Sequence, residues 1–77
     1  MTWEEIVGRN IRRLRKAKGL TQEQLAHDAS VAMRYVAGVE RAEENPSLKF
    51  LVKIADALNV KPAVLLTPEA GPSESEG

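Results

Sequence analysis

The side chains best placed to contact another molecule lie in the stretch from Thr21 to Arg41, TQEQLAHDASVAMRYVAGVER. It contains two short helical patterns separated by a break that is too tight for an ordinary loop. The second pattern turns Val36, Val39 and Glu40 to one side. Its other side faces solvent and carries Met33, Arg34, Ala37, Gly38 and Arg41. Because exposed helix faces are usually charged throughout, this mixed face indicates a binding role.

The same inventory argues against catalysis. Ser30 and Ser47 have no plausible His and Asp partners, the carboxylates lack a cleft, and the chain has no Gly-rich phosphate loop. With no Cys and a single His, a metal centre would need carboxylates that are not suitably clustered. His27 is therefore interpreted as a surface residue. We expect neither an enzyme nor a cofactor or metal site.

The length and the charge distribution limit what the chain can be. Its 77 residues suffice for one domain around a single small core. The formal net charge is zero, but residues 1–41 hold eight Lys or Arg against five Asp or Glu, and residues 42–77 hold three against six. This distribution concentrates positive charge in the first part, as a face that binds a polyanion requires.

The sequence also predicts where the protein resides. No stretch approaches the roughly 20 apolar residues of a membrane span. The beginning of the chain, MTWEEIV, is acidic and amphipathic, unlike a secretory signal. We therefore expect a cytoplasmic protein without membrane contact.

The first of five predicted helices covers residues 3–18. Thr2 and Glu5 form a capping-box pattern before it, and Gly19 suits a left-handed C-terminal cap. The buried stripe is expected to comprise Trp3, Val7, Ile11 and Leu14. Gly8 lies beside this stripe, which indicates a close contact with another helix.

The two middle helices follow the same rules. Thr21 and Gln24 repeat the capping-box pattern, which predicts a second helix from Gln22. Its inward positions are Leu25, Ala26 and Ala29. After the turn at Ser30 and Val31, the third helix covers residues 32–41.

The second half of the chain contains one clear helix and one short helix. Asn45 before Pro46 is biased away from helix, and Ser47 can cap a fourth helix over residues 48–58. The buried positions expected in it are Leu48, Leu51, Ile54, Ala55 and Leu58. Pro62 suits the first position of a fifth helix. The elements together predict an all-α domain of five helices.

The apolar content near the end exceeds what one small core needs. The side chains expected to form a dimer interface are Phe50, Val64, Leu65 and Leu66. Residues 67–77 are rich in Pro, Gly, Ser and Glu and contain no large apolar residue. The folded domain is therefore predicted over residues 1–66, with a disordered tail after it.

The stretch GLTQEQLAHDASVAMRYVAGVERAEENPSLKFLVKIADALNV resembles the helix-turn-helix of the Xre and Cro-like phage-repressor family. The matching elements are GLTQ, the pair Leu25 and Ala26, the step from Tyr35 to Glu40 and Arg41, NPS at residues 45–47, and IADALNV. The resemblance covers about residues 6–66. It implies a lambda-repressor-like fold that binds double-stranded DNA as a homodimer.

Three positions depart from the pattern of this family. Ser30 stands where Gly usually takes a positive φ, so the turn either carries strain of about 1 kcal/mol or has another geometry. Ala32 replaces the usual Ser or Thr cap of the recognition helix, and Ala42 replaces the usual Gly after it. The resemblance also implies an ion pair between Arg15 and Glu40, the alternative being two unrelated surface charges.

The expected roles toward DNA divide by reach. The recognition helix would enter the major groove with the base-reading residues Met33, Arg34, Ala37 and Gly38. The fork of Arg34 matches O6 and N7 of guanine, whereas Met33 offers an apolar contact to a thymine methyl. Gly38 is either a site of close approach to the duplex or a weak point in the helix. Phosphate contacts are expected from Thr21, Gln22, Tyr35 and Arg41.

The resulting prediction is a sequence-specific transcriptional regulator, a repressor rather than an activator. As a homodimer it would place two recognition helices in successive major grooves about 34 Å apart. One alternative is a protein-interaction module of the same fold, such as an antitoxin-like or coactivator-like subunit. Another is a restriction-modification controller that regulates its own promoter. A band-shift assay separates the interaction module from the DNA-binding proteins.

Overall fold

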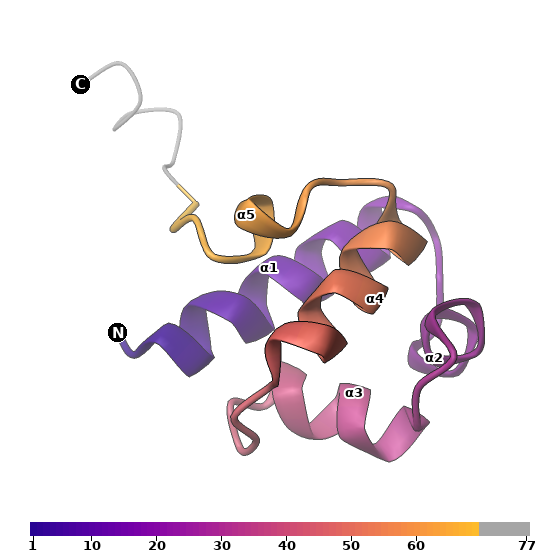
Figure 1. Cartoon of the computed structure of the whole chain (residues 1–77), viewed down its shortest axis with the longest axis horizontal. Coiled ribbons are helices and arrows are strands. Elements are labelled where there is room, and N and C mark those ends of the chain that lie inside the picture. Colours follow the sequence, from indigo (N-terminus) through magenta and orange to yellow (C-terminus); the bar gives the residue numbers. More distant parts are fainter. Residues whose placement is uncertain (70–77) are drawn as a thin grey trace.

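The structure, a computed structural model, describes residues 1–69. Over this range the chain forms five helices and no strand, as the sequence predicted. The helices are α1 (Trp3–Ala17), α2 (Gln22–Ala29), α3 (Met33–Glu40), α4 (Leu48–Leu58) and α5 (Pro62–Leu65). In the view of Figure 1, α4 lies in front of α1, with α5 above them, α2 to one side and α3 below. No helix within residues 1–69 is long and apolar enough to cross a membrane.

Local capping determines where the first two helices begin. The Thr2 hydroxyl accepts a hydrogen bond from the Glu5 amide at 3.1 Å, and the Glu5 carboxylate accepts one from the Thr2 amide at 2.8 Å. Thr21 and Gln24 repeat this exchange at the start of α2. Because each capping box satisfies two otherwise unpaired groups, both predicted boundaries are confirmed. Gly19 adopts the predicted positive φ, at 71°.

The core draws side chains from all five helices. Its largest fully buried apolar side chains are Ile11 of α1, Leu25 of α2, Val36 and Val39 of α3, Ile54 and Leu58 of α4, and Leu65 of α5. The predicted stripe of α1 is wrong at Trp3, which is 60% exposed, whereas Leu14 is partly buried and packs against the core. Trp3 lies in the first turn of α1, which extends beyond α4 and α5 (Figure 1). Leu48, also predicted in the core, is 72% exposed at the start of α4.

Gly8 lets α1 and α3 pack backbone to backbone. A Cβ atom on Gly8 would lie 2.5 Å from the carbonyl oxygen of Val39 and 2.9 Å from that of Glu40. Both carbonyls are backbone atoms of α3, so they cannot rotate away as a side chain would. The close helix contact predicted at Gly8 is therefore confirmed, and it fixes the distance between the two helices.

A buried amide fastens the end of the domain to α1. Asn10 is 1% exposed, and its Nδ2 donates to the carbonyl oxygens of Leu65 and Thr67, both at 2.9 Å, and of Val64 at 3.3 Å. Arg13 adds an ion pair to Glu69 at 2.9 Å. These contacts extend the packed structure beyond the boundary predicted at residue 66. The remainder of the predicted tail, residues 70–77, lies outside the described residues.

Two of the four side chains assigned to a dimer interface are already used inside the monomer. Phe50 is 5% exposed and Leu65 is 0% exposed. Phe50 contacts the Tyr35 ring edge to face, with ring centroids 4.6 Å apart. Leu65 is held at its backbone carbonyl by the hydrogen bond from Asn10. The prediction that these two side chains are left over is therefore wrong. Val64 and Leu66 remain exposed, at 36% and 41%.

Candidate nucleic-acid interface

The turn between α2 and α3 is closed by backbone hydrogen bonds. The amide of Val31 donates to the carbonyl of Ala26 at 3.0 Å, and that of Ser30 donates to His27 at 3.1 Å. These two hydrogen bonds end α2, and the Ser30 backbone lies in the left-handed region, at φ 58°. Of the two alternatives for Ser30, the structure has the strained one: a side chain occupies a conformation that favours Gly.

The third helix begins without a side-chain cap, because its N-cap residue is Ala32. It covers Met33–Glu40, one residue shorter at each end than predicted. Arg41 follows as the C-cap, and Ala42 takes a left-handed φ of 63°. Amides of Ala42 and Glu43 donate to the carbonyls of Val39 and Gly38 at 3.0 and 2.8 Å. The chain therefore turns back toward α3 immediately after this helix.

The outward side of α3 is only partly as predicted. Met33 is 46% exposed, Arg34 is exposed, and Ala37 is half-buried. Gly38 is buried, which contradicts its expected exposure. The reason is Glu44: its Cγ lies 2.7 Å from the point that a Cβ on Gly38 would occupy. Met33, Arg34 and Ala37 remain accessible, whereas Gly38 lies beneath an acidic side chain.

An ion pair locks α3 to α1 at the edge of this face. Arg15 Nε donates to Glu40 Oε2 at 2.7 Å, and Nη2 donates to Oε1 at 3.0 Å. The side chains are 10% and 2% exposed, so the pair is shielded from solvent, and its hydrogen bonds raise the pKa of the Arg15 guanidinium. Arg15 Nη1 also donates to the Leu20 carbonyl at 2.9 Å. The ion pair implied by the family resemblance is present.

Gln22 belongs to the same network, which the sequence analysis missed. Its Nε2 donates to Glu40 Oε1 at 3.0 Å, so the start of α2 is joined to the end of α3. One amide hydrogen of Gln22 is thereby used and the other is free to donate elsewhere. In the sequence, Gln22 is recognisable only as a polar residue at the first position of α2. Helical spacing within α2 does not connect it to Glu40, which lies 18 positions later.

The other residues predicted to bind phosphate differ in the donors they keep. The Thr21 hydroxyl accepts from Gln24, so its own proton remains available. Arg41 Nε pairs with Glu43 at 3.1 Å, leaving the Nη groups of the guanidinium. The Tyr35 hydroxyl donates to the Asn45 carbonyl at 3.3 Å and must turn away from it before it can donate to another acceptor.

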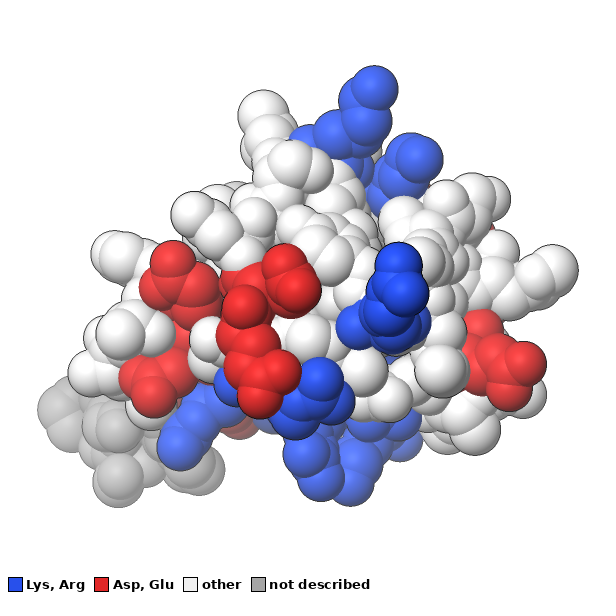
Figure 2. Space-filling view, turned by 90° about the horizontal axis from the view of Figure 1, so that it is seen from below, with Lys and Arg blue, Asp and Glu red and all other residues white. Residues whose placement is uncertain are grey.

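The face that includes α3 is mixed in charge. Figure 2, which views the molecule from below, shows a larger group of acidic side chains on the left of this face and a smaller one at its right edge. Basic side chains occur singly near its middle and in groups at its upper and lower edges. The excess of basic residues in the first part of the chain therefore does not produce one unbroken positive surface. Any polyanion bound here must also approach carboxylates.

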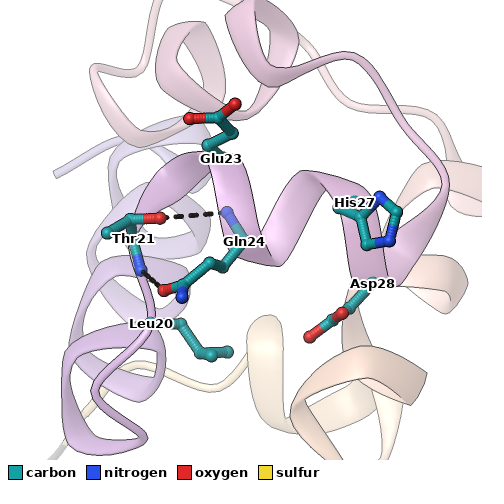
Figure 3. A pocket seen from close by; sticks show the side chains of 6 residues that line it. All are labelled: Leu20, Thr21, Glu23, Gln24, His27 and Asp28. Atoms are coloured by element: carbon teal, nitrogen blue, oxygen red, sulfur yellow. Dashed lines mark hydrogen bonds between the residues drawn. The ribbon is translucent and has the colours of Figure 1, made fainter.

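Apart from the face of α3, a concave region lies along α2, but its side chains have no catalytic arrangement. This open hollow of about 510 Å³ is lined by Leu20, Thr21, Glu23, Gln24, His27 and Asp28 (Figure 3). The Asp28 carboxylate points away from the His27 ring, and the side-chain oxygens of Thr21 and Gln24 accept hydrogen bonds from each other's backbone amides (Figure 3). Within residues 1–69 no group of His, Cys, Asp and Glu is placed to hold a metal ion. Among the described surfaces, α3 with its flanks is the better candidate for binding.

Comparison with known proteins shows which family the domain resembles. The model of the helix-turn-helix family HTH_3 matches residues 11–65. The uncharacterized HTH-type transcriptional regulator y4dJ of Sinorhizobium fredii is 38% identical over 68 residues, covering 88% of each chain.

Two solved structures extend the comparison to three dimensions. The restriction-modification controller protein C.AhdI from Aeromonas hydrophila is 44% identical, with a TM-score of 0.78 over 80% of this chain and 94% of that one. The master regulator for biofilm formation SinR, solved in complex with DNA, is 39% identical, with a TM-score of 0.77 over 79% of this chain and 98% of that one.

Proposed function

The chain belongs to the HTH_3 family of Xre and Cro-like helix-turn-helix proteins, and on this premise we propose that it is a sequence-specific DNA-binding transcriptional regulator. Its recognition helix is α3, which lies in the major groove of the bound duplex. The observation that carries this proposal is the arrangement around Glu40: Arg15 from α1 and Gln22 from α2 both hold its carboxylate. Two other helices, α1 and α2, thus fix the orientation of α3 before DNA arrives.

The exposed side chains of α3 supply the base contacts in this proposal. The planar guanidinium of Arg34 donates two parallel hydrogen bonds, to O6 and N7 of a guanine. Met33 and Ala37 contact apolar groups such as a thymine methyl. These contacts carry sequence information because each base pair presents a different pattern in the major groove.

The flanks of the helix-turn-helix hold the phosphate backbone. Thr21, Gln22 and Arg41 each keep at least one free hydrogen-bond donor. Tyr35 can join them after its hydroxyl turns away from Asn45. Such contacts set the register of the protein on the duplex but do not distinguish bases.

We further propose a homodimer formed by the surface around α5. Val64 and Leu66 are exposed there, and apolar surface of this kind favours self-association. A dimer with two-fold symmetry places its recognition helices about 34 Å apart, on one side of the duplex. The outcome that we propose is repression, in line with the immunity repressor protein of Bacillus phage phi105, which is 40% identical over 63 residues.

A second candidate is a restriction-modification controller that regulates its own promoter. The observation that favours it is size: this chain and the C.AhdI chain match over most of both their lengths. The two candidates share the DNA-binding mechanism and differ only in the promoter bound.

Selection of bound duplexes from a random library, followed by band-shift titration, tests the proposal. We expect a two-fold symmetric consensus, and weaker binding to scrambled duplexes by a factor of about 1,000 or more. Arg34→Glu is the matched control, because it reverses one exposed charge and should abolish selection while leaving the circular dichroism spectrum unchanged. A folded wild-type protein that retains no duplex would overturn the proposal in favour of the protein-interaction module.

A further inference from the structure

Glu44 lies on the recognition helix without belonging to it. Gly38 has no side chain, and the space beside it is filled by Glu44, whose Cγ is 2.7 Å and whose Oε2 is 3.5 Å from the Cβ position of Gly38. Gly38 lies four residues after Arg34, about 6 Å along the axis, on the same outward side. The acidic side chain therefore occupies the place that residue 38 would fill in a helix without Gly.

Two anchors hold the Glu44 backbone in this position. On one side, the Glu43 amide donates to the Gly38 carbonyl at 2.8 Å. On the other side, the Asn45 carbonyl accepts from the Tyr35 hydroxyl at 3.3 Å, and the Tyr35 ring packs against buried Phe50. Glu44 is the single residue between these anchors, so the fold itself returns its side chain to α3.

The carboxylate of Glu44 has no partner within the described residues, in contrast to its neighbours. Glu43 pairs with Arg41 at 3.1 Å, and Glu40 is held by Arg15 and Gln22. The side chain of Glu44 is packed along its stem on Gly38, while the residue as a whole remains exposed. A stem that packs against α3, with a free acceptor at its end, is suited to reading a hydrogen-bond donor.

We propose that Glu44 is a specificity-determining residue that accepts a hydrogen bond from cytosine N4 in the major groove. This inference rests on the proposed function of α3. Cytosine presents an amino donor at this edge, whereas guanine and thymine present acceptor oxygens that repel a carboxylate. Adenine also has an amino group, but N7 beside it is an acceptor, so adenine is second best. Arg34 and Glu44 then read a guanine and a cytosine within one turn of α3.

The test compares base preferences of four proteins: wild type, Glu44→Ala, Glu44→Gln and Gly38→Ala. Each is titrated against the selected duplex and all of its single-base variants. Wild type should prefer cytosine at one position of each half-site by a factor of about 10. Glu44→Ala should lose that preference and keep the guanine preference of Arg34. Glu44→Gln should accept thymine or guanine better than wild type does, because an amide can also donate.

Gly38→Ala approaches the same question without removing the carboxylate. Its Cβ would displace the Glu44 stem, so it should also lose the cytosine preference, while a normal melting temperature shows that the fold is intact. Glu43→Gln is the matched control: it removes the neighbouring carboxylate and should leave every base preference unchanged.

Three results would overturn the inference. Uniformly tighter binding of Glu44→Ala, with unchanged preferences, would mean that the carboxylate only repels phosphate. A changed melting temperature with unchanged preferences would mean that Glu44 only supports the loop. Failure of wild type to bind any duplex would remove the proposed function as well, and this outcome is distinct because it leaves no preference profile to compare.

Discussion

Arg15 and Glu40 join the first helix to the end of the third through two hydrogen bonds, at 2.7 and 3.0 Å, with their side chains shielded from solvent. The same carboxylate accepts from Gln22, and the same guanidinium donates to the Leu20 carbonyl. Three helices, α1, α2 and α3, and the segment between α1 and α2 therefore meet at one ion pair. Its removal should change both the stability of the domain and the position of α3.

The first prediction is that Arg15→Ala and Glu40→Ala are strongly coupled. Each single change leaves a buried charge without its partner and should lower the free energy of unfolding by about 3 to 5 kcal/mol. The double variant should lose less than the sum of the two, because no unpaired charge remains. Urea denaturation of all four proteins measures the coupling energy.

The exposed pair Arg41 and Glu43 provides the control for this cycle. Its distance of 3.1 Å is similar, but both side chains are about 60% exposed. Solvent screening should reduce its coupling energy to about 0.2 to 1 kcal/mol. Equal coupling in the two cycles would contradict the claim that burial makes the Arg15 pair strong.

Local rules explain why so much of the fold could be predicted from the sequence. Thr2, Thr21 and Ser47 each cap the helix that follows them, and such caps depend on neighbours three residues away. The burial of Leu25 and Val36 follows from helical periodicity in the same way. Information of this kind lies within one or two turns of the chain.

The errors concern contacts between distant residues. Asn10 binds carbonyls more than 50 residues away, and Glu44 covers Gly38 only because Ala42 reverses the chain. Phe50 was assigned to a dimer interface, but it packs against Tyr35, which lies 15 positions earlier in the chain. Periodicity identifies which face of a helix is apolar, but it does not say which other element covers that face.

The second prediction concerns the strained turns. Ser30 and Ala42 have φ values of 58° and 63°, where a side chain costs about 1 to 2 kcal/mol. Replacing either by Gly removes this cost but increases the entropy of the unfolded chain, which returns about 0.4 to 1 kcal/mol. We expect Ser30→Gly and Ala42→Gly each to raise the free energy of unfolding by about 0.5 to 1 kcal/mol.

Asn59 offers the matched control for these two changes. It has a similar φ of 59°, but Asn tolerates the left-handed region better than Ser or Ala. Asn59→Gly should therefore raise the free energy of unfolding least of the three variants. Thermal denaturation of all three and of the wild type measures these differences. A gain at Asn59 as large as that at Ala42 would indicate that strain is not the cause.

The third prediction contrasts two glycines inside helices. Ala normally stabilises a helix by about 1 kcal/mol relative to Gly. At Gly8 the added Cβ would meet the rigid backbone of α3 at 2.5 Å, so Gly8→Ala should instead destabilise the domain by about 1 to 3 kcal/mol. At Gly38 it would meet only the mobile stem of Glu44, and Gly38→Ala should not be destabilising. Chemical denaturation that ranks the two variants in the opposite order would refute this account of the α1–α3 contact.

The fourth prediction locates the dimer. Leu66→Glu places a charge on the exposed apolar surface of α5 and should weaken self-association without unfolding the monomer. Met33→Glu introduces the same charge at a similarly exposed apolar position on α3 and should leave self-association unchanged. Sedimentation equilibrium without DNA distinguishes the two. Equal dissociation constants for both variants would exclude α5 from the interface.

The last prediction separates the residues that position the protein from those that read bases. Phosphates are alike at every site, so Gln22→Ala and Arg41→Ala should weaken binding to selected and unselected duplexes by similar factors. Arg41→Ala should also make the salt dependence of log K shallower by about 0.9, because one cation no longer displaces a counterion. Gln22 is neutral, and its removal should leave the slope unchanged.

Arg34→Lys distinguishes reading from positioning at the centre of α3. Lysine keeps the charge but loses the fork that fits guanine, so the salt dependence should stay constant. Preference at one base pair of each half-site should meanwhile fall by a factor corresponding to about 1 to 3 kcal/mol. If Arg34 instead held a phosphate, lysine would substitute well and the preferences would survive. Titration of all single-base variants at two salt concentrations decides between these outcomes, since an unchanged preference profile would remove Arg34 from the base-reading residues.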